Sequence, residues 1–409
     1  MDFRMKKFGV GFGAVLLYLI ALPVLGQETE QSSDLTFDWT PVPELKSRNG
    51  KFQVKLRGRF YLDNAWINNS DNTINLNGTE VRAARIGIDG KYGEKFSFRI
   101  EFDLARDVKA NKDIYIQWKG WATIKVGHHK FGAPMEGSSS SRFTPLMERS
   151  AMINGFGFGR KGGVSITKNF GNSMIKIGAG GGDVDFAKVS SPGFQMSARG
   201  VHAIPIERGY IHFGATLNRL KTTDVETIFL YAARPFQHQA PALINTNRIA
   251  ESQIFFGFEA GIFKGPFNLI NETGFLKATL VAPAQGQANP TFWGSQVTAS
   301  YFLTGEDSPY NPKNGTYARP NIKRPFLKGG PGAIQIVARY DYIDLTDNGI
   351  FGGIQKTVIL GVNWWLASQI KVAVNYSHSN ISQAFLVADN GSDGANKVNA
   401  FGIRTQIDW

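Results

Sequence analysis

Apolar and polar side chains alternate along most of this chain, a pattern that predicts β-strands with different surroundings on their two faces. The segment 51–60, KFQVKLRGRF, shows the alternation clearly. Its apolar face carries Phe52, Val54, Leu56 and Phe60, and its polar face carries Gln53, Lys55, Arg57 and Arg59. The segments 96–105 and 253–263 repeat the pattern, and Arg99 falls on the polar face of the first of them.

Segments of this kind recur from residue 51 to the last residue, separated by clusters of Gly, Asn, Asp and Pro. Besides the three above and the closing segment 400–409, they begin near Val81, Ile114, Ile124, Val164, Met174, Phe194, Ile211, Phe267, Val297, Ile334, Val358 and Val372. The total, about sixteen segments of about ten residues, is typical of an all-β transmembrane antiparallel barrel with apolar residues outside and polar residues inside. A soluble β-sandwich or solenoid is the alternative, but in water it would expose much of a phenylalanine-rich face.

The first 26 residues have the composition of a secretory signal peptide. A basic start precedes an apolar run over residues 8–25, and small residues precede a cleavage site near Gly26. A membrane anchor is the alternative, but proline and glycine interrupt the run and no charged stop-transfer segment follows it. Residues 27–50 are polar, so we expect an N-terminal arm there and one barrel domain over residues 51–409.

The charge balance indicates the class of partner. The chain has 45 Lys and Arg against 33 Asp and Glu, a formal net charge of +12, which favours anionic partners. An exported protein rarely meets nucleic acid, so we expect small anions and outer-membrane lipid, including lipopolysaccharide. The chain has no cysteine, so an exported fold must be stabilised without disulfides.

Motifs for enzymes, cofactors and metals are weak. The segment 157–162, GFGRKG, fits G-x-G-x-x-G, but it neither follows a clear strand nor opens a helix. His128 and His129 are adjacent, so on a strand they would point to opposite faces and could not share a metal. The serines 138–141 lack a G-x-S-x-G elbow, although a hydrolase could still be assembled from distant Ser, His and Asp. We expect no enzyme, cofactor or metal.

Several longer motifs resemble the phosphate-selective porin O and P family. They are SYFLTGEDSPY (300–310), GAIQIVARYDYIDL (332–345) and LGVNWWL (360–366), preceded in the family's order by EFDLARD (101–107), IKVGHHKFGAP (124–134) and SSSSRFTPLMERS (138–150). The resemblance implies a porin of sixteen strands, usually a homotrimer, with a constriction loop folded into the pore. It also implies an internal ladder of basic residues that draws in phosphate, polyphosphate or other small anions.

The resemblance also suggests pore-lining residues. In the aperiodic stretch 131–163, Arg142 matches the basic residue after the serine run, Ser140 and Ser141 match the serines before it, and Arg149 matches a following arginine. Arg82 and Arg85 resemble basic lumen positions. They join the candidates from the strand faces, which are Lys55, Arg57, Arg59 and Arg99.

Each of these basic residues could instead sit at the external rim, bridge lipopolysaccharide, or pair with Glu101 and Asp103. The mid-chain stretch 226–238, where phosphate-binding members bring several arginines into the pore, retains Arg234 and His238. The basic stretch 317–330 is expected to be an external loop. The functional alternatives are a weakly selective general-diffusion porin and a structural or adhesive barrel that binds a surface partner through its loops.

The closing segment 400–409, AFGIRTQIDW, ends on an aromatic residue. As the last strand of a barrel it would direct Arg404 and Asp408 to the lumen and present Phe401, Ile403, Ile407 and Trp409 to lipid. It also resembles the C-terminal signal that barrel assembly machinery recognises in such proteins.

Overall fold

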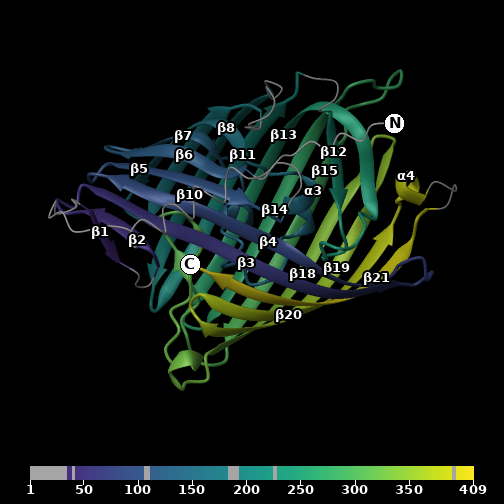
Figure 1. The fold of residues 1–409 in the computed structure, drawn as a ribbon. Helices are drawn as coiled ribbons and strands as arrows, with labels where there is room; N and C mark the ends of the chain where they lie inside the picture. The colour runs from purple at the N-terminus through teal and green to yellow at the C-terminus, as the bar shows by residue number, and fades with distance from the viewer. Residues whose placement is uncertain (1–34, 39–41, 106–110, 183–192, 224–227, 389–392) are drawn as a thin grey trace, which may run out of the picture.

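A computed structural model describes residues 35–38, 42–105, 111–182, 193–223, 228–388 and 393–409. Sixteen antiparallel strands form a closed barrel (Figure 1). They are β3 (Phe52–Asn69), β4 (Asn75–Tyr92), β5 (Phe96–Asp103), β6 (Asn111–Lys119), β7 (Thr123–His129), β8 (Lys161–Phe170), β9 (Ser173–Gly180), β10 (Phe194–Ile206), β11 (Gly209–Lys221), β13 (Ile244–Lys264), β14 (Phe267–Leu280), β15 (Thr291–Phe302), β18 (Ala333–Asp347), β19 (Ile350–Ala367), β20 (Ile370–Ser382) and β21 (Asn396–Asp408).

Closure comes from the pairing of the last strand with the first. β21 runs antiparallel to β3 from Val398 opposite Asn69 to Asp408 opposite Arg59. In hydrocarbon an unpaired strand edge would leave backbone groups without partners, and closure removes that edge. The predicted fold class, an all-β barrel of sixteen strands, is therefore confirmed, and the sandwich alternative is wrong.

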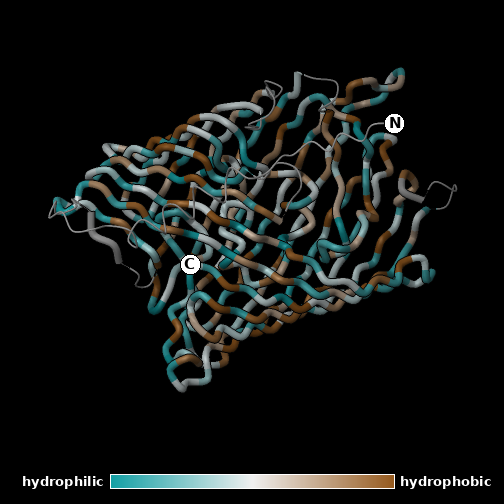
Figure 2. Tube along the Cα trace, in the orientation of Figure 1, coloured by the Kyte–Doolittle hydropathy of each residue, from teal (hydrophilic) through white to brown (hydrophobic). Residues whose placement is uncertain are grey.

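The two faces of the strands follow the predicted alternation. On β14, Phe267, Leu269 and Phe275 point outward and are 37–43% exposed, whereas Asn268 and Glu272 point inward and are buried. The same alternation of brown and teal runs along many strands in Figure 2. On β21, the buried Arg404 contrasts with the exposed Phe401.

The two ends of the barrel differ in the length of their connections. At the end that carries the C-terminus, residues 207–208 join β10 to β11 and residues 265–266 join β13 to β14. At the opposite end, residues 130–160 join β7 to β8 and residues 222–243 join β11 to β13. Outer-membrane barrels have short periplasmic turns and longer extracellular loops, so we assign the short-turn end to the periplasmic side.

One long connection lies at the short-turn end. Residues 303–332 join β15 to β18 and carry the small hairpin β16 (Tyr310–Asn311) and β17 (Thr316–Tyr317) and the turn η2 (Phe326–Lys328). They include the basic stretch 317–330, which the sequence suggested was an external loop. The strand directions place this connection at the short-turn end. Neighbouring strands run antiparallel, so β15 ends at the barrel end where β11 begins.

The remaining elements lie at the ends of the barrel. β1 (Leu35–Asp38) and β2 (Glu44–Ser47) form a hairpin that pairs with the start of β3, within the expected N-terminal arm. β12 (Phe229–Ala233) pairs with the start of β13, and α4 (Phe385–Ala388) lies between β20 and β21. The expected signal peptide lies outside the described residues. None of the helices in the described part of the chain has the length and apolarity needed to cross a membrane.

Candidate functional site

The connection 130–160 lies inside the barrel, against one side of the wall. It contains α2 (Met135–Ser138) and α3 (Ala151–Gly155). Three of its backbone N–H groups donate to inward-facing side chains of the wall: Glu136 N to Glu272 Oε1 on β14 (2.9 Å), Ala151 N to Asp341 Oδ2 on β18 (2.9 Å), and Met147 N to Asn375 Oδ1 on β20 (2.9 Å). The aperiodic sequence of this loop is possible because the wall supplies the hydrogen bonds that a strand or helix would otherwise supply.

Internal contacts also hold the loop in shape. The Arg149 guanidinium donates to the carbonyls of Glu136 (Nε, 3.0 Å) and Ser139 (Nη2, 2.8 Å). The Glu136 carboxylate accepts from Ser150 N (2.8 Å) and forms a buried ion pair with Arg339 of β18. Arg149 therefore orders the backbone of residues 138–141, which we call the serine segment, and also contributes positive charge.

An apolar cluster occupies the lumen beside the loop near the long-loop end. Phe156 and Phe158, which follow α3, pack against Phe255 of β13, with ring centroids 6.0 and 4.7 Å apart, and Phe156 also contacts Tyr231 of β12. Further members come from the inner faces of other strands: Leu276, Ala278, Phe292, Ile343, Leu345, Ile381, Val398 and Ala400. We call this set the apolar plug. Because it fills the side of the lumen next to β13–β21, the open volume lies beside β3–β9.

A polar cavity of about 510 Å³ lies between the serine segment of the loop and the inner faces of β3–β9. Its lining includes eight arginines and four lysines: Arg57, Arg59, Arg85, Arg99, Arg142, Arg149, Arg160, Arg199, Lys119, Lys125, Lys130 and Lys176. Among the described residues that line it, Asp113 is the only carboxylate. The hydroxyl groups of the serines 138–141 complete the loop side. Such a surface attracts anions and offers several donors to their oxygens.

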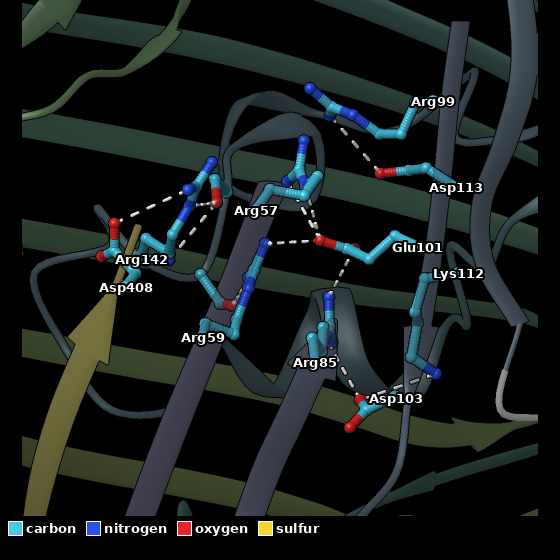
Figure 3. A network of polar contacts seen from close by, with 12 residues as sticks. Arg57, Arg59, Arg85, Arg99, Glu101, Asp103, Lys112, Asp113, Arg142 and Asp408 are labelled. Carbon is cyan, nitrogen blue, oxygen red and sulfur yellow. Dashed lines mark hydrogen bonds and ion pairs between the residues drawn. The ribbon is translucent and has the colours of Figure 1, made fainter. Parts of the chain in front are cut away.

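The arginines of β3 and β4 are organised around one buried carboxylate, Glu101 of β5 (Figure 3). Its Oε1 lies 3.0 Å from Arg57 Nη2 and 3.6 Å from Arg59 Nη2, and its Oε2 lies 3.5 Å from Arg85 Nη1. Arg57 also pairs with Asp89, and Arg85 pairs with Asp103 (both 2.9 Å). The arginines therefore both line the cavity and pair with acids, two roles that the sequence presented as alternatives.

Arg142 and the serines join the loop to this wall. Arg59 Nη1 donates to Ser141 Oγ (3.0 Å), and Arg142 Nε donates to Ser140 Oγ (3.3 Å). Arg142 Nη1 lies 3.6 Å from Asp408 Oδ1 on the last strand. Burial, and the positive charge of nearby Arg59, lower the pKa of Arg142 to about 10. Arg142 still carries its charge at neutral pH.

The cavity brings together eight of the ten candidate residues: Arg57, Arg59, Arg85, Arg99, Ser140, Ser141, Arg142 and Arg149. The other two, Lys55 and Arg82, lie outside this cavity. Lys55 lies on the part of β3 that pairs with β2, and its Nζ is 2.7 Å from Glu44 Oε2. Arg82 points to the loop, where its Nε lies 3.0 Å from Glu148 Oε1.

Sequence reasoning missed several of the lining cations. Lys125 lies between Ile124 and Val126, and Lys176 lies between Ile175 and Ile177, so the alternation that selected Arg57 could have identified both. Arg160 and Lys130 lie in the loop, where no periodicity exists to guide a prediction. Burial lowers the pKa of Lys130, whose Nζ donates to the carbonyl of Gly137 (3.1 Å).

The mid-chain basic residues lie away from the cavity. Arg234 Nη1 donates to the carbonyl of His238 (2.6 Å), and His238 Nδ1 lies 2.9 Å from Glu80 Oε2. Phe236 between them is buried and packs with Leu146 of the loop. This connection therefore packs on the loop, and neither Arg234 nor His238 lines the basic cavity.

The connection 303–332 reaches the cavity from the short-turn end. Asn314 and Thr316 line it, and Tyr317 N donates to Ser139 Oγ of the loop (3.0 Å). Arg199 of β10 donates to the carbonyls of Asn314 (2.8 Å) and Gly315 (2.7 Å). Loop and connection therefore meet at the serine segment. Among the described residues, no group of His, Asp and Glu is arranged to hold a metal ion.

Known proteins resemble this chain in sequence and in fold. Residues 54–409 match the family model described as phosphate-selective porin O and P. A protein of Caulobacter vibrioides, described as uncharacterized, is 27% identical over 398 residues, which cover 92% of this chain and 78% of that protein. The fold resembles an anion-selective porin from Comamonas acidovorans (14% identity, TM-score 0.53, covering 87% of this chain and 100% of that one). It also resembles OmpT, an outer membrane protein of Vibrio cholerae (12% identity, TM-score 0.55, 88% and 98% covered), one structure of which is a trimer form.

Proposed function

Because this chain belongs to the phosphate-selective porin O and P family, we propose that it forms a water-filled, anion-selective channel for phosphate, polyphosphate or other small anions. The chain is an outer-membrane porin of the Gram-negative type, a channel rather than an enzyme. The anion selectivity of this channel is our proposal. It is supported above all by the basic cavity, whose lining contains twelve cationic side chains and Asp113.

The mechanism follows from fixed charges in a narrow passage. Several cations with low-dielectric protein behind them focus the potential and raise the local concentration of anions. Guanidinium groups donate paired hydrogen bonds to phosphate or carboxylate oxygens, which replace part of the hydration shell. Conduction also requires that each site release its ion. The spread of cations from Arg99 through Arg59 to Arg142 supplies several adjacent sites in place of one deep one.

The test is an electrical measurement on purified protein in a planar bilayer. Under a chloride gradient the reversal potential should have the anion-selective sign, and low phosphate should block chloride current. Arg142→Ala should weaken the block by about tenfold, the loss expected for one charge-assisted contact. Arg208→Ala is the matched control, because Arg208 lies in the β10–β11 turn and is 58% exposed.

Each alternative function has its own outcome. Weak anion preference without phosphate block would indicate a general-diffusion porin. Absence of conductance would favour a structural or adhesive barrel, and cation selectivity would contradict the proposal.

We also propose a homotrimer that contacts its copies through the wall formed by β20, β21 and β3. Polar side chains face outward there: the Tyr376 hydroxyl donates to Asn399 Oδ1 (2.9 Å), and Asn399 Nδ2 donates to Asn68 Oδ1 (3.4 Å). Polar groups in contact with lipid are costly, and contact with another subunit would shield them. Light scattering on the detergent-solubilised protein should give three chains per particle. Export by a cleaved signal peptide and insertion by barrel assembly machinery complete the proposal.

A further inference from the structure

Three cationic side chains face outward near the long-loop end of β11 and β14. Arg219 and Lys221 lie on β11 and Lys277 lies on β14, and all three are exposed. Across the intervening strand β13, Ile254 pairs with both Arg219 and Lys277. Neighbouring strands lie about 4.8 Å apart, so the backbones of Arg219 and Lys277 are about 10 Å apart. The long side chains can therefore converge on one ligand.

An apolar row lies directly below these cations, toward the middle of the barrel. Leu217 of β11, Phe256 of β13 and Phe275 of β14 are paired across the three strands and are 50%, 41% and 43% exposed. We call the three cations and these three residues the β11–β14 patch. It combines positive charge at one level with an apolar surface at the next, which fits an anionic amphiphile.

Within the described part of the chain, the cations of the patch have no acidic partners, unlike the arginines of the lumen. In the lumen, Arg57, Arg85 and Arg199 each pair with a carboxylate. No ion pair or side-chain hydrogen bond joins Arg219, Lys221 or Lys277 to another described residue. A cation on the lipid face costs about 2–4 kcal/mol at the midplane and little at the interface, so these three belong at the level of the lipid head groups.

We propose that the β11–β14 patch binds lipopolysaccharide of the outer leaflet. The cations would contact its phosphates, and its acyl chains would lie on Leu217, Phe256 and Phe275. The location fits, because the long-loop end is the extracellular end and the phosphorylated lipid of that leaflet is lipopolysaccharide. Strands β15, β18 and β19 separate the patch from the β20–β21–β3 wall, so trimer contacts at that wall would leave the patch open to lipid. This inference rests on insertion as an outer-membrane porin and is independent of which anion the pore conducts.

The test compares lipid retained by purified protein. Wild type and the variant Arg219→Gln/Lys221→Gln/Lys277→Gln are purified from one Gram-negative host in mild detergent. Native mass spectrometry then measures bound lipopolysaccharide and the binding of added bisphosphorylated lipid A. Each basic residue near an anionic surface contributes about 1 kcal/mol, so the triple variant should bind at least about tenfold more weakly. The matched control is Lys91→Gln/Lys264→Gln/Lys356→Gln, which removes three exposed lysines elsewhere on the strands.

Each outcome of this experiment either supports or contradicts the lipopolysaccharide site. Loss of lipid A binding in the triple variant alone, with wild-type conductance, supports the patch. Equal binding by wild type and the triple variant, equal loss in the control, or equal binding of phosphatidylglycerol would each overturn it. The heat-dependent gel shift of folded barrels identifies any variant that does not fold. In that case the charge reversal Arg219→Glu alone should reduce binding, and unchanged binding would count against the patch.

Discussion

Glu101 is the carboxylate around which the arginines of β3 and β4 are arranged. It is 1% exposed and lies within 3.6 Å of guanidinium nitrogens from Arg57, Arg59 and Arg85. Glu101 therefore holds these three guanidinium groups at defined positions, and Asp89 and Asp103 are further partners of Arg57 and Arg85. Without this carboxylate, the cluster of three arginines would attract anions more strongly, but it would be less ordered because like charges repel.

The variant Glu101→Gln tests this balance. It keeps the size of the side chain and removes one negative charge next to the cavity. The reversal potential under a chloride gradient should become more anion-selective, and phosphate block should strengthen, since the local potential is more positive. A shift toward cation selectivity would contradict the assignment of this cluster to the conduction path. Glu94→Gln, in the exposed turn between β4 and β5, is the control.

Glu148 ties the loop to the barrel wall, and its titration predicts a pH dependence of stability. Its Oε1 lies 3.0 Å from both Arg82 Nε and Arg404 Nη2. Burial raises the pKa of this carboxyl, but the charges of Arg82 and Arg404 outweigh burial and lower it to about 2. The group is therefore more acidic in the folded protein than in the unfolded chain, so its contribution is complete above about pH 4.5 and is lost as the pH falls toward 2.

We expect Glu148→Gln to lower the melting temperature at pH 7, because it leaves Arg82 and Arg404 without this carboxylate. Removing one partner of a buried ion pair costs about 3–5 kcal/mol, and partial exposure places this one near the lower limit. The gap between wild type and variant should close as the pH is lowered from 4.5 to 2, as followed by tryptophan fluorescence during heating. A gap that stays constant over this range would show that the ion pair does not stabilise the fold.

At the scale of elements, the sequence predicts the strands well because each has lipid on one side and polar groups on the other. Phe96, Phe194 and Phe267 begin strands where the alternation places them. Where both faces of a strand are apolar, the alternation no longer shows which residues face the lumen. Phe255 points into the lumen between Ile254 and Phe256, which point outward, because it packs on the loop residue Phe158. Only the three-dimensional path of the loop reveals that partner.

The sequence also predicts some residues of the candidate site and not others. Arg57, Arg59 and Arg99 could be placed on a polar strand face from their spacing, and Arg142 from its resemblance to the family. The role of Arg199 could not be predicted in this way. Its guanidinium donates to the carbonyls of Asn314 and Gly315, which are more than a hundred residues away in the sequence. The hairpin β16–β17 is short and its sequence has no alternation, so nothing in the sequence indicates that it enters the barrel.

The position of this hairpin can be tested with an engineered disulfide, since the chain has no cysteine of its own. Asn169 Nδ2 of β8 donates to the carbonyl of Lys313 (2.5 Å), so these two residues are neighbours where the hairpin meets the wall. The variant Asn169→Cys/Lys313→Cys should crosslink under mild oxidation, and current fluctuations should decrease and return on reduction. Lys313→Cys alone is the control. Failure to crosslink would show that the hairpin is displaced from the wall.

At the scale of the whole molecule, the apolar plug and the basic cavity occupy different sides of the same lumen. The plug occupies the side of the lumen beside β13–β21, so the anion path that we propose runs along the cationic wall of β3–β9. Selectivity then depends on the plug as much as on the arginines. A barrel of this size without the plug would offer a second path in which water could screen the fixed charges.

The double variant Phe156→Ala/Phe158→Ala tests this dependence. Truncating a buried phenylalanine costs about 3–5 kcal/mol, but the closed strand pairing should keep the barrel intact while the plug loosens. Single-channel conductance should rise and anion selectivity should fall together, because the added current passes a wall that lacks the cation cluster. Phe258→Ala, which removes an outward-facing ring that is 51% exposed, should change neither quantity. If conductance rose while selectivity stayed at the wild-type value, the plug would be filling space without directing ions to the basic wall.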